Sequence, residues 1–208
     1  MAGITGFGVF LLTALLMNIT PGTDTMYIVS RSMSQGRKAG MYSVLGISTG
    51  VLAHTFFAAA GLSVILANSA VLFTTVKIIG AGYLIYLGLR TFFQTSSDFH
   101  VTKTAKISNK KIFTQGFLTN ITNPKVALFF LSFLPQFIAA DHNGPVPFII
   151  LGLSFVFTGT LWCLFIAIFV SSVTQKLRNH PKVEGMMNKI TGILFIGLGI
   201  KLFQTKAS

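Results

Sequence analysis

The sequence predicts an all-α integral membrane protein with six transmembrane helices, arranged as two inverted three-helix repeats in which helices one and four are broken at proline. Three observations predict this fold. Only 10% of the 208 residues are charged, against about 25% in soluble domains. Long apolar stretches recur along the chain, and a short proline-containing motif occurs twice. The composition excludes a disordered chain, a collagen and a coiled coil.

A transmembrane helix needs about 20 mostly apolar residues, and six segments meet this need. They cover residues 6–30, 41–67, 70–93, 112–139, 146–173 and 186–203. Polar residues and proline interrupt the first segment at 18–22 and the fourth at 120–124. Because no basic region precedes the first segment and it lacks a convincing cleavage site, we interpret it as a retained span rather than a signal peptide.

The basic residues indicate which side of the membrane each loop faces. The chain has 16 Lys and Arg against 4 Asp and Glu, and 12 of the 16 flank alternate connections, at 31–38, 90–111 and 176–189. The positive-inside rule makes these three loops cytoplasmic and places both termini outside. The basic residues of a nucleic-acid-binding surface would have no reason to alternate between successive loops of the membrane segments, so we expect no nucleic-acid partner.

Two similar motifs predict the internal repeat. Residues 18–21 read NITP and residues 120–124 read NITNP, and each lies near the centre of its segment. Three segments separate the two copies, and an odd number inverts the second copy. We therefore expect a first repeat over 1–93, a cytoplasmic linker over 94–110 and a second repeat over 111–208. Inverted repeats with interrupted helices are typical of secondary transporters, whose site lies at the repeat interface.

The two interruptions are the predicted binding site. Proline removes a backbone donor and leaves a carbonyl unpaired, which hydrocarbon tolerates only where protein or a wet cavity covers it. Exposed carbonyls and half-helix ends suit the carboxylate and ammonium of a small zwitterion, although a simple packing kink is the alternative. The expected substrate-binding residues are Asn18, Thr20, Pro21, Gly22, Asp24, Asn120, Thr122, Asn123, Pro124 and Lys125.

Asp24 and Lys125 are the two charges that follow these interruptions. Asp24 is the only acid within a predicted span, and an acid at that depth is a functional candidate by default. It can serve as a proton relay, as an ammonium site, or as the cap of the second half-helix. Lys125 can pair with Asp24, bind a substrate carboxylate, or extend its ammonium toward the interface.

Four other features have weaker functional meaning. His54 lies in mid-span and can pass protons, or it is a neutral side chain bonded to a neighbouring helix. Gly46 and Gly50 form a GxxxG pattern that brings helices close and permits a dimer. Cys163 is the single cysteine and is expected to be a packing residue, while the 21 Phe are expected to face mostly lipid. No motif for a metal, a cofactor or a catalytic nucleophile occurs.

The motifs together resemble those of the LysE/RhtB amino-acid exporters. Residues 18–24 (NITPGTD) are similar to the family's PGP motif, and residues 116–125 (GFLTNITNPK) look like its second motif. Residues 34–40 (SQGRKAG), 80–88 (GAGYLIYLG) and the glycine-bearing last helix at 195–201 also resemble the family. Thr23 stands where the family has the second proline.

The resemblance implies a transporter and not an enzyme. It implies export of amino acids or related metabolites across the bacterial inner membrane by the proton-motive force, with amino acid, protons and lipid as partners. Because few fixed charges lie at the expected site, we favour neutral substrates. From the implied use of the proton-motive force we expect proton antiport, with Asp24 and His54 carrying the proton. The alternatives are a passive small-solute channel and a subunit of a membrane complex without transport activity.

Overall fold

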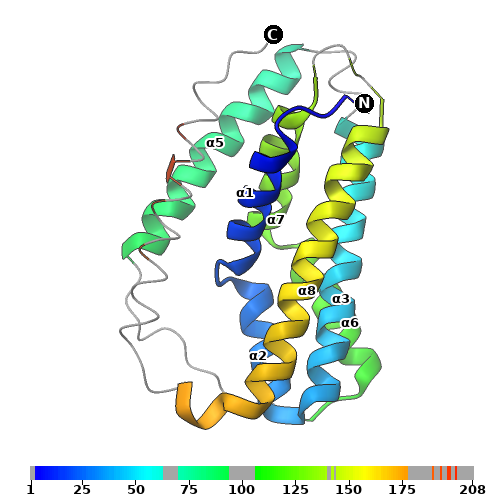
Figure 1. The fold of residues 1–208 in the computed structure, drawn as a ribbon, viewed down its shortest axis with the longest axis vertical. Coiled ribbons are helices and arrows are strands. Elements are labelled where there is room, and N and C mark those ends of the chain that lie inside the picture. Colours follow the sequence, from blue (N-terminus) through cyan, green and yellow to red (C-terminus); the bar gives the residue numbers. More distant parts are fainter. Residues whose placement is uncertain are drawn as a thin grey trace.

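The computed structural model of the chain describes residues 3–62, 70–93, 106–139, 142, 144–177 and the isolated positions 189, 193, 196, 197 and 200. Within these residues the regular structure is helical, apart from one isolated β-bridge between Ile4 and Ile138. The helices lie roughly along one long axis (Figure 1). Their bounds are α1 Phe7–Ile19, α2 Thr23–Gln35, α3 Arg37–Phe57, the π-helix η1 Ala58–Leu62, α5 Ala70–Phe93, α6 Asn109–Ile121, α7 Pro124–Leu128, the π-helix η3 Phe129–Phe133, the 3-10 helix η4 Leu134–Phe137, and α8 Val146–Leu177.

The described helices are those of a membrane protein. Two unbroken helices are long and apolar enough to cross a bilayer, Arg37–Leu62 and Val146–Phe169, and two bent pairs bring the number to four. Helix α5 has the bounds of the predicted third segment. The sixth predicted segment lies outside the described residues except at the isolated positions. The all-helical membrane class is therefore confirmed, and the full set of six spans stays a prediction.

Both predicted interruptions are breaks between helices. The bend between α1 and α2 is 48°, and the bend between α6 and α7–η4 is 46°. Pro124 begins α7, where a missing N–H costs nothing, and the Asn123 side chain caps that helix by accepting from the Lys125 N–H at 3.0 Å. Gly22 is the residue before α2 and provides no side-chain cap. The two broken spans run in opposite directions, and their breaks lie near mid-height (Figure 1).

Glycines let α3 lie very close to its neighbours. A side chain at Gly46 would collide with the backbone carbonyl of Phe113 on α6, and one at Gly50 would collide with Asn120. The expected close approach of helices at the GxxxG pattern is confirmed. Gly36 alone joins α2 to α3 with a φ of 81°, a conformation that favours glycine.

Among the described phenylalanines as many are buried as are exposed, so the expectation that they mostly face lipid holds for only part of them. Phe129 stacks within 4.7 Å of Phe155 and 5.3 Å of Phe133, measured between ring centroids. All seven buried rings belong to one hydrophobic core cluster. The buried phenylalanines are Phe10, Phe129, Phe130, Phe133, Phe137, Phe148 and Phe155.

The residues before α1 are tied to the end of the second broken span. The Thr5 N–H donates to the Phe137 carbonyl at 2.8 Å, and the Ala139 N–H donates to the Gly3 carbonyl at 2.8 Å. Phe10 also packs edge-on against Phe137, with 5.3 Å between the ring centroids. This end of the molecule therefore joins α1 to η4 through both backbone and side-chain contacts.

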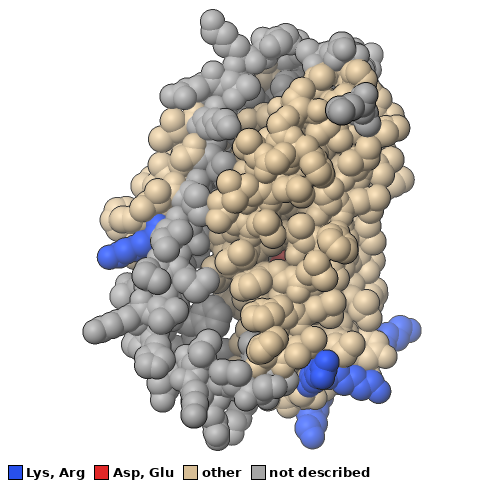
Figure 2. Space-filling model, in the orientation of Figure 1, with Lys and Arg blue, Asp and Glu red and all other residues tan. Residues whose placement is uncertain are grey.

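Exposed basic residues lie at the opposite end. Arg37 and Lys38 begin α3, and Lys110 and Lys111 lie in the first turn of α6, all of them exposed. Figure 2 shows most of the blue Lys and Arg atoms at this lower end, below a largely uncharged surface. The N-terminal residues lie at the other end (Figure 1), which agrees with the separation that the sequence predicts.

Candidate functional site

A small cavity lies where the two breaks meet α3 and α8. Its volume is ≈ 40 Å³, and one water molecule needs about 10–15 Å³. The cavity therefore has room for a few waters and is too small for an amino acid. Five of the ten predicted substrate-binding residues line it: Asn18, Gly22, Asp24, Asn120 and Lys125.

Asp24 and Asn120 join the two broken spans across the cavity. Asp24 lies in the first turn of α2, where the helix dipole stabilises a carboxylate. The Asn120 amide donates to Asp24 Oδ2 at 2.8 Å. The other carboxylate oxygen of Asp24 and the amide oxygen of Asn120 are buried and accept no hydrogen bond from the described residues. A buried carboxylate oxygen that accepts no hydrogen bond suits a ligand that donates one.

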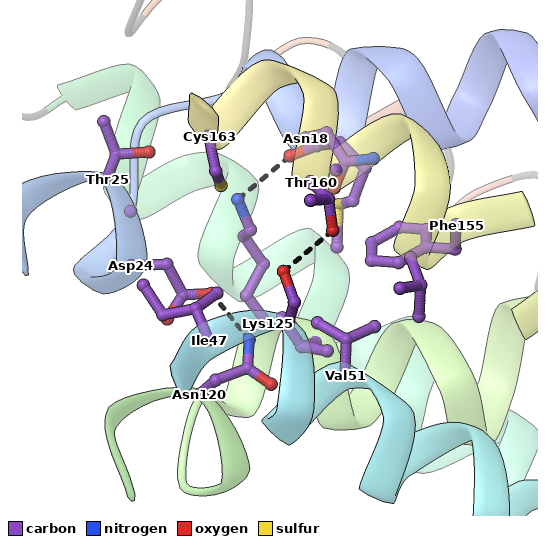
Figure 3. A pocket seen from close by; sticks show the side chains of 16 residues that line it. Asn18, Asp24, Thr25, Ile47, Val51, Asn120, Lys125, Phe155, Thr160 and Cys163 are labelled. Atoms are coloured by element: carbon purple, nitrogen blue, oxygen red, sulfur yellow. Dashed lines mark hydrogen bonds between the residues drawn. The ribbon is translucent and has the colours of Figure 1, made fainter. Parts of the chain in front are cut away.

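Lys125 caps the C-terminal end of α1 and does not form an ion pair with Asp24. Its ammonium donates to the carbonyls of Met17 and Thr20, both at 3.0 Å. These carbonyls belong to the broken end of α1, where a cation is favourable. An ion pair with Asp24, one of the alternatives that the sequence leaves open, is not formed, because the carbonyls freed by the break attract the ammonium instead. Lys125 crosses between the breaks and points toward Asn18 and Cys163 (Figure 3).

The asparagines of the two motifs have matching surroundings. A side chain at Gly159 on α8 would lie 2.9 Å from the Asn18 amide oxygen, and one at Gly50 on α3 would lie 2.6 Å from the Asn120 amide oxygen. Each asparagine thus occupies the space that a glycine of a neighbouring helix leaves free. Asn18 also donates to the Thr158 hydroxyl at 3.1 Å.

The other predicted residues shape the breaks but do not line the cavity. The hydroxyls of Thr20 and Thr122 each donate to a carbonyl four residues earlier, Leu16 and Leu118, at 2.7 Å. Thr122 is exposed. Threonine hydroxyls in helices readily make this bond to their own backbone. The remaining three are Pro21 within the first break, and Asn123 and Pro124 at the start of α7.

His54 contacts the site through Asn120. It is buried on α3, stacks on Phe130 with 5.8 Å between ring centroids, and lies 3.2 Å from the Asn120 carbonyl through Nε2. Since a carbonyl oxygen only accepts, Nε2 carries the hydrogen in this contact. The expected bond to a neighbouring helix is present, and His54 itself does not line the cavity.

Several lining residues carry no signal in the sequence. Ser48 and Thr160 share a hydrogen bond of 2.7 Å between α3 and α8. Cys163, expected to be a packing residue, lines the cavity as well. One side of the cavity is apolar and includes Val51 and Phe155. No pattern in the sequence singles out these positions, because their contacts depend on how the helices pack against one another.

Comparisons with known proteins agree on one family. Residues 15–206 match the family described as LysE type translocator. The chain is 39% identical to the uncharacterized membrane protein YrhP of Bacillus subtilis, over 90% of this chain and 93% of that protein. It is 29% identical to the leucine efflux protein of Salmonella typhimurium, over 96% of this chain and 95% of that protein.

An uncharacterized membrane protein of Vibrio cholerae is 28% identical over 95% of this chain and 96% of its own length. No solved structure matches the chain significantly. The match covers both breaks and nearly the whole sequence, so the chain belongs to the LysE type translocator family and is a membrane transporter, not an enzyme.

Proposed function

We propose that this protein is a secondary exporter of neutral amino acids, or closely related zwitterions, that exchanges them for protons. The observation that carries the proposal is the buried Asp24 carboxylate, one oxygen of which accepts no hydrogen bond from the described residues, with the Lys125 ammonium in the same cavity. Membership of a translocator family and the relatives named leucine efflux protein support amino-acid export.

The cavity offers one group for each charge of a zwitterion. An α-ammonium group donates to the Asp24 oxygen that otherwise accepts no hydrogen bond from the described residues, which is left unsatisfied at a cost without it. An α-carboxylate meets the Lys125 ammonium and, beside Gly22, the uncapped start of α2. Thr20 and Thr122 do not line the cavity. Their hydroxyls bond to the backbone before each break and so support the helix ends around it.

The protons compete with the substrate at the same carboxylate. Asp24 is the only acid among the described residues, so it is the group on which a proton and a substrate ammonium exclude each other. His54 lies one residue away, beyond Asn120, and is the second proton carrier. One charge that crosses the membrane yields about 2.3 kcal/mol per 100 mV, which supports a concentration ratio of more than tenfold.

The export cycle uses the two halves of the chain as inverted repeats, with six spans, the linker at 94–110 on the cytoplasmic side and both termini outside. The near-equal bends of 48° and 46° and their opposite directions support this arrangement. So do the matched environments of Asn18 and Asn120. Because the cavity is smaller than an amino acid, the halves have to separate before substrate enters, as alternating access requires.

Efflux from cells loaded with dipeptides tests the proposal. Hydrolysis of the dipeptides raises internal amino acids, and the medium is assayed for all of them with and without a protonophore. We expect selective release of a few neutral amino acids that the protonophore suppresses, and exchange of labelled substrate across the membrane, which a passive channel does not support.

Asp24→Asn is the decisive variant. It should abolish gradient-driven export while the protein still reaches the membrane. Asp98→Asn is the matched control, since the sequence places Asp98 in the linker, and it should export normally. Normal proton-driven efflux by the Asp24→Asn protein would remove Asp24 from the mechanism.

A further inference from the structure

The cavity has an apolar end that the ammonium and carboxylate groups of a bound zwitterion do not contact. Met17 from α1, Val51 from α3, Val126 from α7, and Phe155 and Val156 from α8 line it. Four of these five side chains are almost fully buried, with between 2% and 7% of their surface exposed. Phe155 and Val51 of this end lie on the opposite side of Lys125 from Asp24 (Figure 3).

Phe155 gives this end a fixed wall. Its ring lies 4.7 Å from that of Phe129 and 5.5 Å from that of Phe130, measured between centroids. Both neighbours belong to the π-helix η3 and are themselves buried. A ring held between two others in a close-packed interior cannot move aside without disturbing them. Val51 is buried on α3 and lies beside Phe155 in the same wall (Figure 3).

We propose that Phe155 and Val51 set the size of the substrate side chain, so that the transporter accepts branched aliphatic amino acids and rejects aromatic ones. This inference rests on the proposed function. With the ammonium group at Asp24 and the carboxylate at Lys125, the substituent on Cα extends toward the apolar end. No charged side chain lines that end among the described residues, so a lysine or arginine side chain would find no partner there.

The two positions allow widening and narrowing of the wall, each with a matched control on the same helix. Phe155→Leu and Val51→Ala remove atoms from the wall. Phe148→Leu and Val44→Ala make the same changes seven residues earlier on α8 and α3, at buried positions that do not line the cavity. Val51→Phe narrows the wall instead.

Cells loaded with the dipeptide leucyl-phenylalanine provide the test, because hydrolysis supplies both amino acids in equal amounts. The ratio of their initial efflux rates does not depend on how much transporter reaches the membrane. One methylene group in an apolar pocket changes selectivity by about 10- to 200-fold. We therefore expect the phenylalanine-to-leucine ratio to rise at least about tenfold in Phe155→Leu and Val51→Ala, and to stay unchanged in the two controls.

Val51→Phe should lose leucine efflux and retain alanine efflux, in cells loaded with alanyl-leucine. If Phe155→Leu does not fold, the two Val51 variants decide the question. Leucine efflux with an unchanged ratio in the widened variants would overturn this inference and leave the exporter standing. Absence of amino-acid efflux from the unsubstituted protein would overturn the proposed function, and this inference with it.

Discussion

Replacing Gly50 with alanine tests whether the contact between Asn120 and Asp24 matters for transport. The added Cβ would lie 2.6 Å from the Asn120 amide oxygen and 2.8 Å from its Cβ. Ordinary contacts of this kind begin near 3.4 Å. Asn120 would have to move by about 0.8 Å, because the close packing of α3 on α6 at Gly46 prevents the helices from separating freely.

This displacement is large enough to break the hydrogen bond to Asp24. A shift of about 0.8 Å along that bond takes its 2.8 Å to about 3.6 Å, a length at which no hydrogen bond remains. A hydrogen bond to a charged group contributes about 1.5–3 kcal/mol. If that amount is lost from substrate binding, efflux at low substrate concentration falls about 10- to 150-fold.

Initial efflux rates per transporter in the membrane measure the effect, with Gly8→Ala as the control, since a side chain at Gly8 meets nothing within 4 Å. A double-mutant cycle then separates the local contact from general disturbance. In an Asn120→Ala background, Gly50→Ala should cause little further loss. Unchanged efflux in Gly50→Ala, or an equal loss with and without Asn120, would refute the reasoning.

Three further substitutions or modifications test other contacts of the site. Lys125→Met should lower the midpoint of thermal unfolding in detergent by about 5 °C, because the carbonyls of Met17 and Thr20 lose their donor; an unchanged midpoint would mean that Lys125 does not stabilise the break. His54→Gln keeps an amide donor for Asn120 but cannot titrate, so efflux should lose its pH dependence near neutrality; an unaltered pH profile would exclude His54 as a proton carrier. N-ethylmaleimide should block efflux by alkylating Cys163, and leucine should slow this alkylation. Efflux by the Cys163→Ser protein should not be affected by the reagent. If the reagent still blocks efflux in that variant, the reactive group lies elsewhere.

The sequence predicts the breaks and the charged residues of the site because their signals are local. Proline in the middle of a long apolar segment interrupts the helix there, so both bends are visible in the motifs that contain Pro21 and Pro124. A charge in hydrocarbon is costly, which draws attention to Asp24 and Lys125 at once. Their partners are not local, so the sequence leaves several alternatives open for Lys125, and a bond to the carbonyls of Met17 and Thr20 is not among them.

The apolar part of the site cannot be predicted in this way. Lipid is about as apolar as a protein interior, so Val51 or Phe155 has the same character whether it faces lipid, the core or a cavity. The buried phenylalanines were assigned to the lipid face for this reason. Cys163 and the Ser48–Thr160 contact also depend on how α3 crosses α8, which no pattern within either helix reveals.

The backbone bonds between residues 3–5 and 137–139 have a consequence for how the protein moves. They join the start of α1 to the end of η4, so these two parts move as one rigid unit rather than independently. Any motion that opens this end of the protein must carry both parts together or first unzip the short bridge at Ile4 and Ile138. A bulky tag fused close to Gly3 would hinder the joint motion of α1 and η4, and we expect it to slow transport. The same tag on a longer spacer should not hinder this motion.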